Sequence, residues 1–171
     1  MIVVEGAVTV DDLDTVLSEL NAVAAAHDVT VQAFDARYVV DRRHLERAVE
    51  LADRAFDRGE NVARERSVEI LLYAAGRRQI DDALEMGVSE GRLPVAVVVA
   101  ATGDAPDRET AAADALRERL DLDIDPTATL DSTDDDRVRD FFDVTSAELD
   151  AVDGDLSDLI AERVALLDVK K

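Results

Sequence analysis

The chain has 171 residues, of which 47% are hydrophobic, and a formal net charge of −21. This length fits one domain with a core of its own, and the hydrophobic content excludes a disordered acidic tail. Because the sequence contains no cysteine, disulfides and thiolate zinc sites are excluded as well.

No export or membrane signal is recognisable in the sequence. The segment 1–10 has no basic region, and no apolar run approaches the roughly 20 residues of a membrane span. An excess of acids with few lysines is typical of proteins from a high-salt cytoplasm, where the screening length falls to about 3 Å at molar salt. We therefore expect a soluble, cytoplasmic protein with no membrane contact, whose acidity serves solubility.

Hydrophobic periodicity predicts alternating strands and helices at the beginning of the chain. The expected elements are a strand over 2–8, a helix over 11–26, a strand over 29–40 and a helix over 42–58. Asp41 is the expected N-cap of the second helix, and Gly59 is expected to end it. His27 and His44 lie near helix ends and not in a zinc-binding spacing, so we expect both at the surface or its boundary.

The most distinctive stretch follows a polar loop and reads EILLYAAGRRQI, from Glu69 to Ile80. Residues 68–75 are apolar or aromatic except for Glu69, which predicts a helix wrapped by protein on most sides. This helix begins at either Asn61 or Ser67, and Gly76 is expected to end it with a positive φ. Two arginines then follow the break. A second short helix is predicted next, with three inward-facing residues: Ile80, Ala83 and Leu84.

The second half of the chain predicts one buried strand and several helices. The expected elements are a strand over 93–101, helices over 107–120 and 138–144, a short helix capped by Thr145, and a last helix from Asp155 or Ser157. The end, 165–171, is open between helix and strand. The three consecutive aspartates 134–136 lack the spacing of a calcium loop, so we expect a solvated loop there and no metal site.

The residues carry no established catalytic motif. A phosphate-binding loop, a nucleophile elbow and a dinucleotide glycine fingerprint are all missing from the sequence. Composition and pattern together predict a non-enzymatic α/β domain without a cofactor. Charge is spread unevenly, because residues 37–92 hold 11 basic and 12 acidic residues whereas the remainder holds 8 and 28. The near-neutral third is therefore the expected binding face.

The stretch Glu69–Ile80, followed by Ala83 and Gly87, resembles a recurring segment of the small kinase-binding subunit of the KEOPS complex. This is the PRPK-binding protein family, called TPRKB in animals. The resemblance extends to 61–63, to His44, Leu45 and Ala48, and to 162–171, so it covers nearly the whole chain. The family often has serine where this chain has Ala75. With the acidic composition, the chain is identified as a member from a haloarchaeon.

The resemblance implies a fold and a set of partners. The implied fold is mixed α/β (α+β): a single domain over 1–171 with a small central mixed β-sheet flanked by helices, and no catalysis of its own. KEOPS makes the threonylcarbamoyl modification of adenosine (t6A) in tRNA that reads ANN codons. A metal-dependent transferase subunit does the chemistry beside an atypical kinase-like ATPase. The family binds and activates that kinase and captures tRNA by its 3′ CCA end, while the transferase is an indirect partner.

A single-stranded CCA end calls for cations at phosphate and for stacking or hydrogen bonds at splayed bases. The expected tRNA-binding residues are Asn61, Arg64, Arg66, Tyr73, Arg77, Arg78 and Gln79. The expected partner-binding residues are Leu159, Ile160 and Val164. The alternatives are structural: the paired arginines cap a helix, Gln79 ties down a loop and Tyr73 is core.

Two other functions stay open at this point. The first is a pure protein-interaction adaptor of the kinase that does not touch RNA. The second is a small-molecule-binding or enzymatic α/β domain. Binding to intact and CCA-trimmed tRNA separates the leading hypothesis from the adaptor, and activity of the isolated chain would favour the third class.

Overall fold

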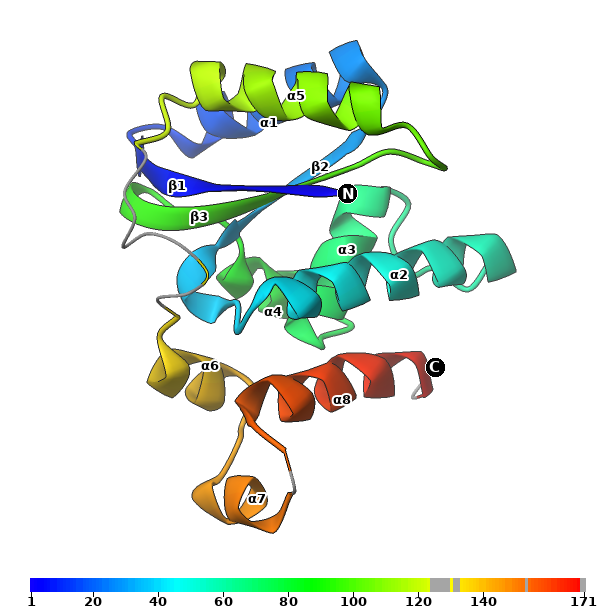
Figure 1. The fold of residues 1–171 in the computed structure, drawn as a ribbon, viewed down its shortest axis with the longest axis vertical. Coiled ribbons are helices and arrows are strands. Elements are labelled where there is room, and N and C mark those ends of the chain that lie inside the picture. The colour runs from blue at the N-terminus through cyan, green and yellow to red at the C-terminus, as the bar shows by residue number, and fades with distance from the viewer. Residues whose placement is uncertain (124–129, 131–132, 153, 170–171) are drawn as a thin grey trace. The chain divides into compact units, whose positions relative to one another are not determined.

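The computed structural model describes residues 1–123, 130, 133–152 and 154–169. The expected mixed α/β class, with helices and a small sheet, is confirmed (Figure 1). The elements in chain order are β1 (Ile2–Val10), α1 (Leu13–His27), β2 (Thr30–Asp35), η1 (Ala36–Tyr38), α2 (Arg42–Arg58), α3 (Arg66–Ala75), α4 (Ile80–Ala83), η2 (Leu84–Met86), β3 (Gly91–Ala100), α5 (Pro106–Arg119), α6 (Asp135–Phe141), α7 (Ser146–Ala151) and α8 (Leu156–Val169). Among the described residues, no helix is both long enough and apolar enough to cross a membrane.

The chain forms two compact units. One consists of Met1–Ala36 with Gly87–Ser132, and the other of Arg37–Met86 with Thr133–Lys171. That they act as one domain over 1–171 stays a prediction.

The first unit is a three-stranded sheet in the order β1-β3-β2, covered on one face by α1 and α5 (Figure 1). β3 is central, and its residues from Val95 to Ala100 are buried, as the continuous apolar run predicted. The expected mixed strand directions need correction. β1 and β2 run in the same direction, but β3 lies between them and pairs antiparallel with each. In the pairing of β1 with β3, Ile2 lies opposite Val99, and in the pairing of β2 with β3, Thr30 lies opposite Ala100.

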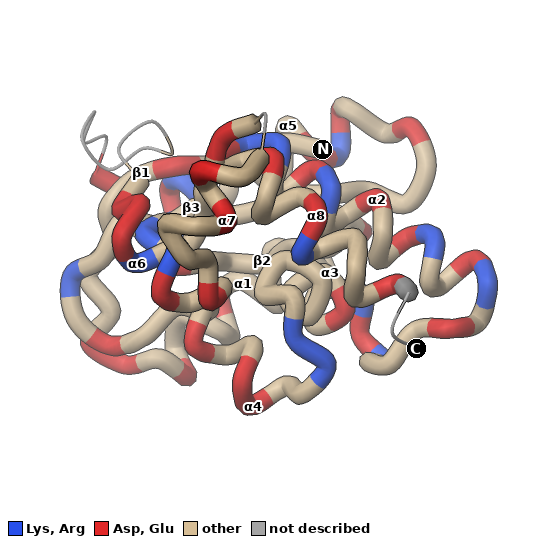
Figure 2. The backbone as a smooth tube through the Cα atoms, turned by 90° about the horizontal axis from the view of Figure 1, so that it is seen from below, with Lys and Arg blue, Asp and Glu red and all other residues tan. Residues whose placement is uncertain are grey.

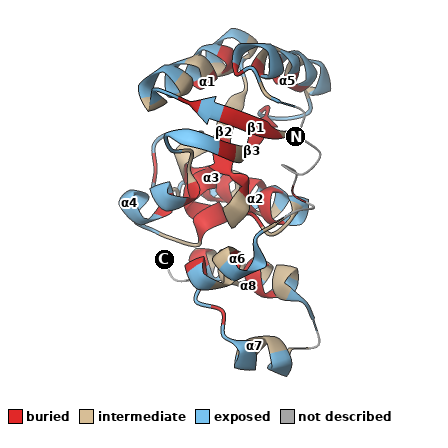
Figure 3. Cartoon of the chain, turned by 90° about the vertical axis from the view of Figure 1, so that its left-hand side faces the viewer, coloured by how far each residue is buried: buried red, intermediate tan, exposed pale blue. Residues whose placement is uncertain are grey.

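The second unit is helical, and α3 lies at its centre, packed against α2 and α8. Every residue of α3 from Glu69 to Ala75 is buried, which confirms the predicted buried helix (Figure 3). α2 has the predicted bounds because Asp41 accepts a hydrogen bond from the His44 N–H at one end and Gly59, with φ 67°, closes the other. α7 has no buried residue, and Thr145 with Glu148 forms its capping box.

Three local predictions were wrong. Ile80 and Leu84 are 44% and 55% exposed, whereas Ala83 and Met86 are buried. The reason is that α4 lasts only one turn and continues as the 3₁₀-helix η2, which changes the angular spacing of the side chains. The second strand ends at Asp35 because η1 takes up the next three residues. The third error is the solvated loop expected at 134–136, because Asp134 caps α6 and the next two aspartates form its first turn. The closing segment, which was open between helix and strand, is helical as far as Val169.

Candidate functional site

The C-terminal end of α3 is closed by a left-handed glycine. Gly76 has φ 60°, and its N–H bonds to the Tyr73 carbonyl while the Arg77 N–H reaches back to that of Leu72. A Cβ at this position would lie 3.6 Å from the ring of Phe142. Positive φ favours glycine here, whereas a Cβ would make only an ordinary contact with the ring, so it is the left-handed backbone that lets the chain leave the buried helix abruptly and places residues 77–79 outside the core.

The two arginines after the break have different roles. The Arg77 guanidinium donates to the Phe141 carbonyl and lies over the Phe141 ring, 5.1 Å from its centroid. Arg78 and Gln79 are exposed, and the side chain of neither makes a hydrogen bond or ion pair within the described part of the chain. Figure 2 shows this basic segment directly before α4, which contains Asp81 and Asp82. Arg77 therefore connects the C-terminal end of α3 to α6, whereas the side chains of Arg78 and Gln79 are available to a ligand.

The other predicted cations lie at the opposite end of α3. Arg66, in its first turn, makes a bidentate ion pair with Asp53 at 2.6 and 2.9 Å, so its guanidinium is structural. Arg64 is exposed, with no partner among the described residues. The helix has 10 residues, and a rise of 1.5 Å per residue separates its two ends by about 15 Å. The four arginines expected to bind tRNA thus lie in two separate places, one at each end of α3.

The loop before α3 is held by a buried carboxylate. Glu69 Oε2 accepts the N–H groups of Val62 and Ala63 at 3.0 and 2.7 Å. Asn61 donates its side-chain amide to the Ala63 carbonyl at 2.8 Å, so it stabilises the loop it was expected to use for base recognition. Arg64 follows directly on this ordered backbone. The loop is therefore shaped by its own hydrogen bonds.

Four of the expected site residues are in the core. Tyr73 is 1% exposed and donates its hydroxyl to Asp168 Oδ1 at 3.1 Å, so the predicted stacking face is wrong. The partner-binding assignment is corrected in the same way, because three α8 residues are buried within this chain: Leu159, Ile160 and Val164. The outward apolar residue of α8 is Leu166, which is 43% exposed.

His44, expected near the surface, is a buried structural residue. Its Nε2 lies 2.7 Å from the Ala74 carbonyl, its Nδ1 is 3.4 Å from the Val40 N–H, and burial lowers its pKa to about 4. The ring is therefore neutral at pH 7, with its proton on Nε2, and it satisfies a carbonyl that the end of α3 leaves without a helical partner. The signal was present in the sequence, since His44 continues the buried stripe of α2 through Ala48 and Leu51.

Aromatic rings connect the helix break to two grooves of the second unit. Tyr38, Phe141, Phe142 and His44 form a chain of edge-to-face contacts, with centroids 5.2, 5.0 and 5.6 Å apart. At one end lies a groove of about 560 Å³, which we call the Tyr38 groove; its lining includes Tyr38, Arg77, Glu85 and residues along the whole length of α6. A smaller groove of about 150 Å³ is lined by Gly76, Phe142, Arg163 and Leu166.

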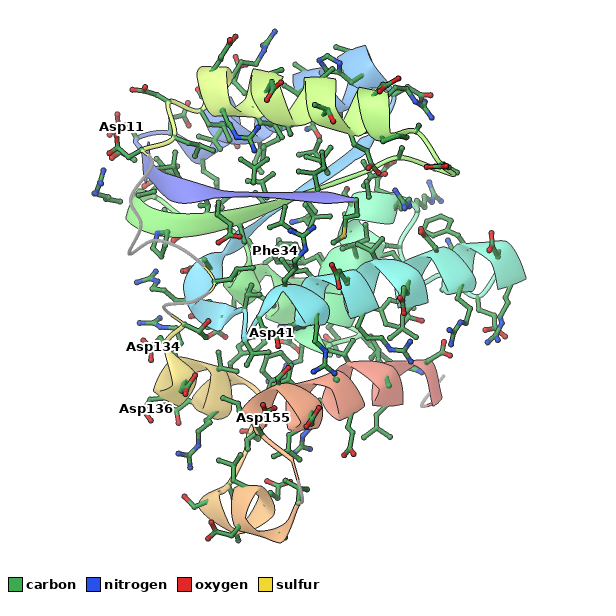
Figure 4. All side chains as sticks on the ribbon, in the orientation of Figure 1. Asp11, Phe34, Asp41, Asp134, Asp136 and Asp155 are labelled. Atoms are coloured by element: carbon green, nitrogen blue, oxygen red, sulfur yellow. The ribbon has the colours of Figure 1, made fainter. Side chains whose placement is uncertain are left out.

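Sequence reasoning missed the Tyr38 groove because its residues come from three distant segments. Arg137 lies over the Tyr38 ring, 5.3 Å from the centroid, and donates to the Tyr38 hydroxyl at 3.4 Å. Asp134 caps α6, and the N–H of Arg137 holds the pKa of its carboxyl below the usual value. Asp134 and Asp136 are labelled in Figure 4 at the start of α6. Within the described ranges, no three acidic or histidine side chains are arranged to hold a metal.

The fold and these surfaces define a small α+β protein whose distinctive features are exposed grooves and, beside them, a basic segment with an exposed Arg78. Residues 9–168 match the family described as kinase binding protein CGI-121, and the chain belongs to this family. The resemblance to the small kinase-binding subunit is thereby confirmed. No curated protein matches the chain.

Proposed function

We propose that the chain is a non-catalytic regulatory subunit that binds and activates the atypical kinase of a KEOPS complex and recruits tRNA through its 3′ CCA end. Membership in a kinase-binding family supports the kinase partner. The complex, the t6A modification and the tRNA rest on the resemblance and on the surface around the end of α3.

The observation that carries the RNA part is the exposed segment Arg78–Gln79. It offers a guanidinium and a side-chain amide that are both unpaired among the described residues, immediately after a break fixed by Gly76 and Arg77. A cation for phosphate next to a donor and acceptor for base edges is what an unpaired RNA end requires. The strongly acidic remainder of the chain repels RNA, so binding is confined to this segment.

A gel shift with intact and CCA-trimmed tRNA tests this assignment. The wild type is expected to prefer intact tRNA by about tenfold or more, since base contacts at single strands contribute strongly. Arg78→Glu combined with Gln79→Ala should remove this preference. Arg117→Glu makes the same charge reversal on an exposed face of α5 and serves as the matched control. Equal binding of both RNAs by the wild type would overturn the CCA assignment, and binding of neither would leave the chain as a kinase adaptor without RNA contact.

The kinase surface is proposed on α8, around Leu166 and the small groove beside it. An exposed leucine next to a groove fits the apolar centre of a protein interface, and apolar burial persists at salt concentrations that screen charge pairs. Leu166→Glu is expected to reduce copurification with the kinase. Leu17→Glu is the matched control, because Leu17 on α1 is 42% exposed. Equal loss with both variants, or no loss with either, would overturn the assignment.

A further inference from the structure

The outward face of α1 carries almost no charge on a protein that is otherwise strongly acidic. Residues 15–26 contain a single charged side chain, Glu19, and its carboxylate is paired with Arg119 at 2.6 Å. Only Leu20 and Val23 of α1 are buried, so most of this uncharged stretch faces outward (Figure 3). On a chain of net charge −21, an uncharged and partly apolar helix face indicates a surface for contact with another protein.

One side of this face combines a projecting side chain with a hollow. Leu17 is 42% exposed, and Asn21 and Ala25 follow it at intervals of four residues, so all three lie along the same side of the helix. Beyond Leu17 this side borders a hollow of about 380 Å³, which we call the α1 hollow. Its lining includes Asn21, Ala24, Ala25, Asp28, Val29 and Thr30. The same side of α1 therefore has an apolar projection at one end and space to receive one at the other.

This arrangement is complementary to a second copy of itself. In two antiparallel helices related by a two-fold axis at Asn21, Leu17 of each copy lies opposite Ala25 of the other, at the α1 hollow, because both are four residues from Asn21. The Asn21 side chain has no hydrogen bond among the described residues. Because its amide is both donor and acceptor, the amides of the two copies can pair with each other at the axis. A basic partner, which an acidic chain attracts elsewhere, meets few free carboxylates on this face.

Net charge opposes the pairing of two copies, and salt relieves this opposition. Each copy carries −21, and the antiparallel pairing brings Asp14 of one copy toward Asp28 of the other, since both lie seven residues from Asn21. The Asp28 carboxylate is bonded to Arg108, which offsets part of the repulsion. Salt screens the charges that remain without weakening apolar contacts, so high salt should favour the pair.

We infer that α1 is the interface of a symmetric antiparallel dimer, in which Leu17 of each copy fills the α1 hollow of the other and the Asn21 amides meet at the axis. A pair of 15-residue helices is small beside the roughly 1,200–2,000 Å² of a stable interface, so the dimer dissociates on dilution. The α1 residues belong to the first unit, whereas those assigned to RNA and to the kinase belong to the second. The inference therefore does not rest on the proposed function.

Sedimentation velocity of the full chain over a concentration series tests for the dimer. The wild type is expected to shift from 18.6 kDa toward twice this mass as its concentration rises. The shift should come at lower protein concentration in about 1 M than in about 0.1 M KCl, because the screening length falls from about 10 Å to about 3 Å. A wild type that stays monomeric up to about 1 mM, or a dimer that salt weakens, overturns the inference.

Two matched substitutions locate the interface. Leu17→Glu places a carboxylate in the α1 hollow and should raise the dissociation constant at least about tenfold. Leu84→Glu makes the same change at a 55% exposed position of the second unit and should alter the constant by less than about twofold. Equal effects of the two variants overturn the inference. Leu17→Glu should still copurify with the kinase, so failure of the dimer and failure of the proposed function are told apart.

Cysteine cross-linking tests the register, because the chain has no cysteine of its own. Asn21→Cys places one thiol of each copy at the axis, where oxidation by copper phenanthroline should join them in an intermolecular disulfide. Ala111→Cys, at an exposed alanine of the neighbouring helix α5, is the control and should stay unlinked. Cross-linking that is equal at the two positions reflects random collision and overturns the inference.

Discussion

The two ends of α3 are fixed by buried polar side chains of opposite kind. At the N-terminal end the carboxylate of Glu69 accepts two backbone N–H groups of the preceding loop, and at the C-terminal end neutral His44 donates to the Ala74 carbonyl. Glu69 thus satisfies two N–H groups of the loop, and His44 satisfies a carbonyl that the end of the helix leaves over. One apolar helix thus holds two differently built surfaces about 15 Å apart.

The largest effect is expected from weakening the helix between these ends. Leu72 is buried, and Leu72→Ala should lower the free energy of unfolding by about 2–5 kcal/mol, as large-to-small core substitutions do. Denaturant unfolding monitored by circular dichroism measures the loss. Leu84→Ala, at an exposed position, is the control and should change stability by less than about 0.5 kcal/mol. Similar midpoints for both variants would show that α3 is not the centre of this unit.

The C-terminal end should be sensitive to acid. Burial lowers the pKa of His44 from 6.5 to about 4, so the unfolded chain binds this proton more readily than the folded chain. The contribution of the neutral ring to the stability of the folded chain is complete above pH 6.5 and is lost as the pH falls toward 4. Acidification from pH 7 to pH 5 therefore lowers the free energy of unfolding by about 2 kcal/mol through His44.

His44→Gln isolates that contribution, because glutamine can donate a hydrogen bond to the same carbonyl without titrating. The difference in unfolding free energy between the wild type and the variant is measured at both pH values, which cancels the titration of the many carboxylates. We expect the difference to shrink by about 2 kcal/mol on acidification. A difference that does not depend on pH would contradict a buried, neutral His44.

The N-terminal end should respond to loss of charge on Glu69. Glu69→Gln keeps one acceptor oxygen but weakens charge-assisted bonds to the Val62 and Ala63 N–H groups, at a cost of about 1–2 kcal/mol. Limited proteolysis should then cut the loop 60–65 faster, and Glu65→Gln, an exposed neighbour, is the control. Equal cutting of both variants would mean that Glu69 does not shape the loop.

These predictions depend on features that the sequence revealed unequally. The bounds of α2 were predictable because Asp41 and Gly59 mark both ends chemically, and the burial of α3 followed from its missing polar face. Ile80 and Leu84 were misplaced because one turn of helix followed by a 3₁₀ turn is too short to show a period. The Tyr38 groove was not predictable, because it depends on packing between segments far apart in the chain.

The smallest effect is expected at Arg64, and it decides whether the two ends of α3 act as one RNA site. Arg64 and Arg78 are both exposed and unpaired among the described residues, so a reversal to glutamate changes the same charge at either end. At about 15 Å, more than a Debye length at physiological salt, charges at the two ends act almost independently.

If the CCA end lies at the C-terminal end, Arg78→Glu should abolish the preference for intact tRNA and reduce the salt slope of binding by about one, the value for one phosphate contact. Arg64→Glu should change affinity by less than about threefold and leave the slope unchanged. Equal losses of slope would show that one RNA strand spans the whole helix, and the division of α3 into two separate surfaces would then be wrong.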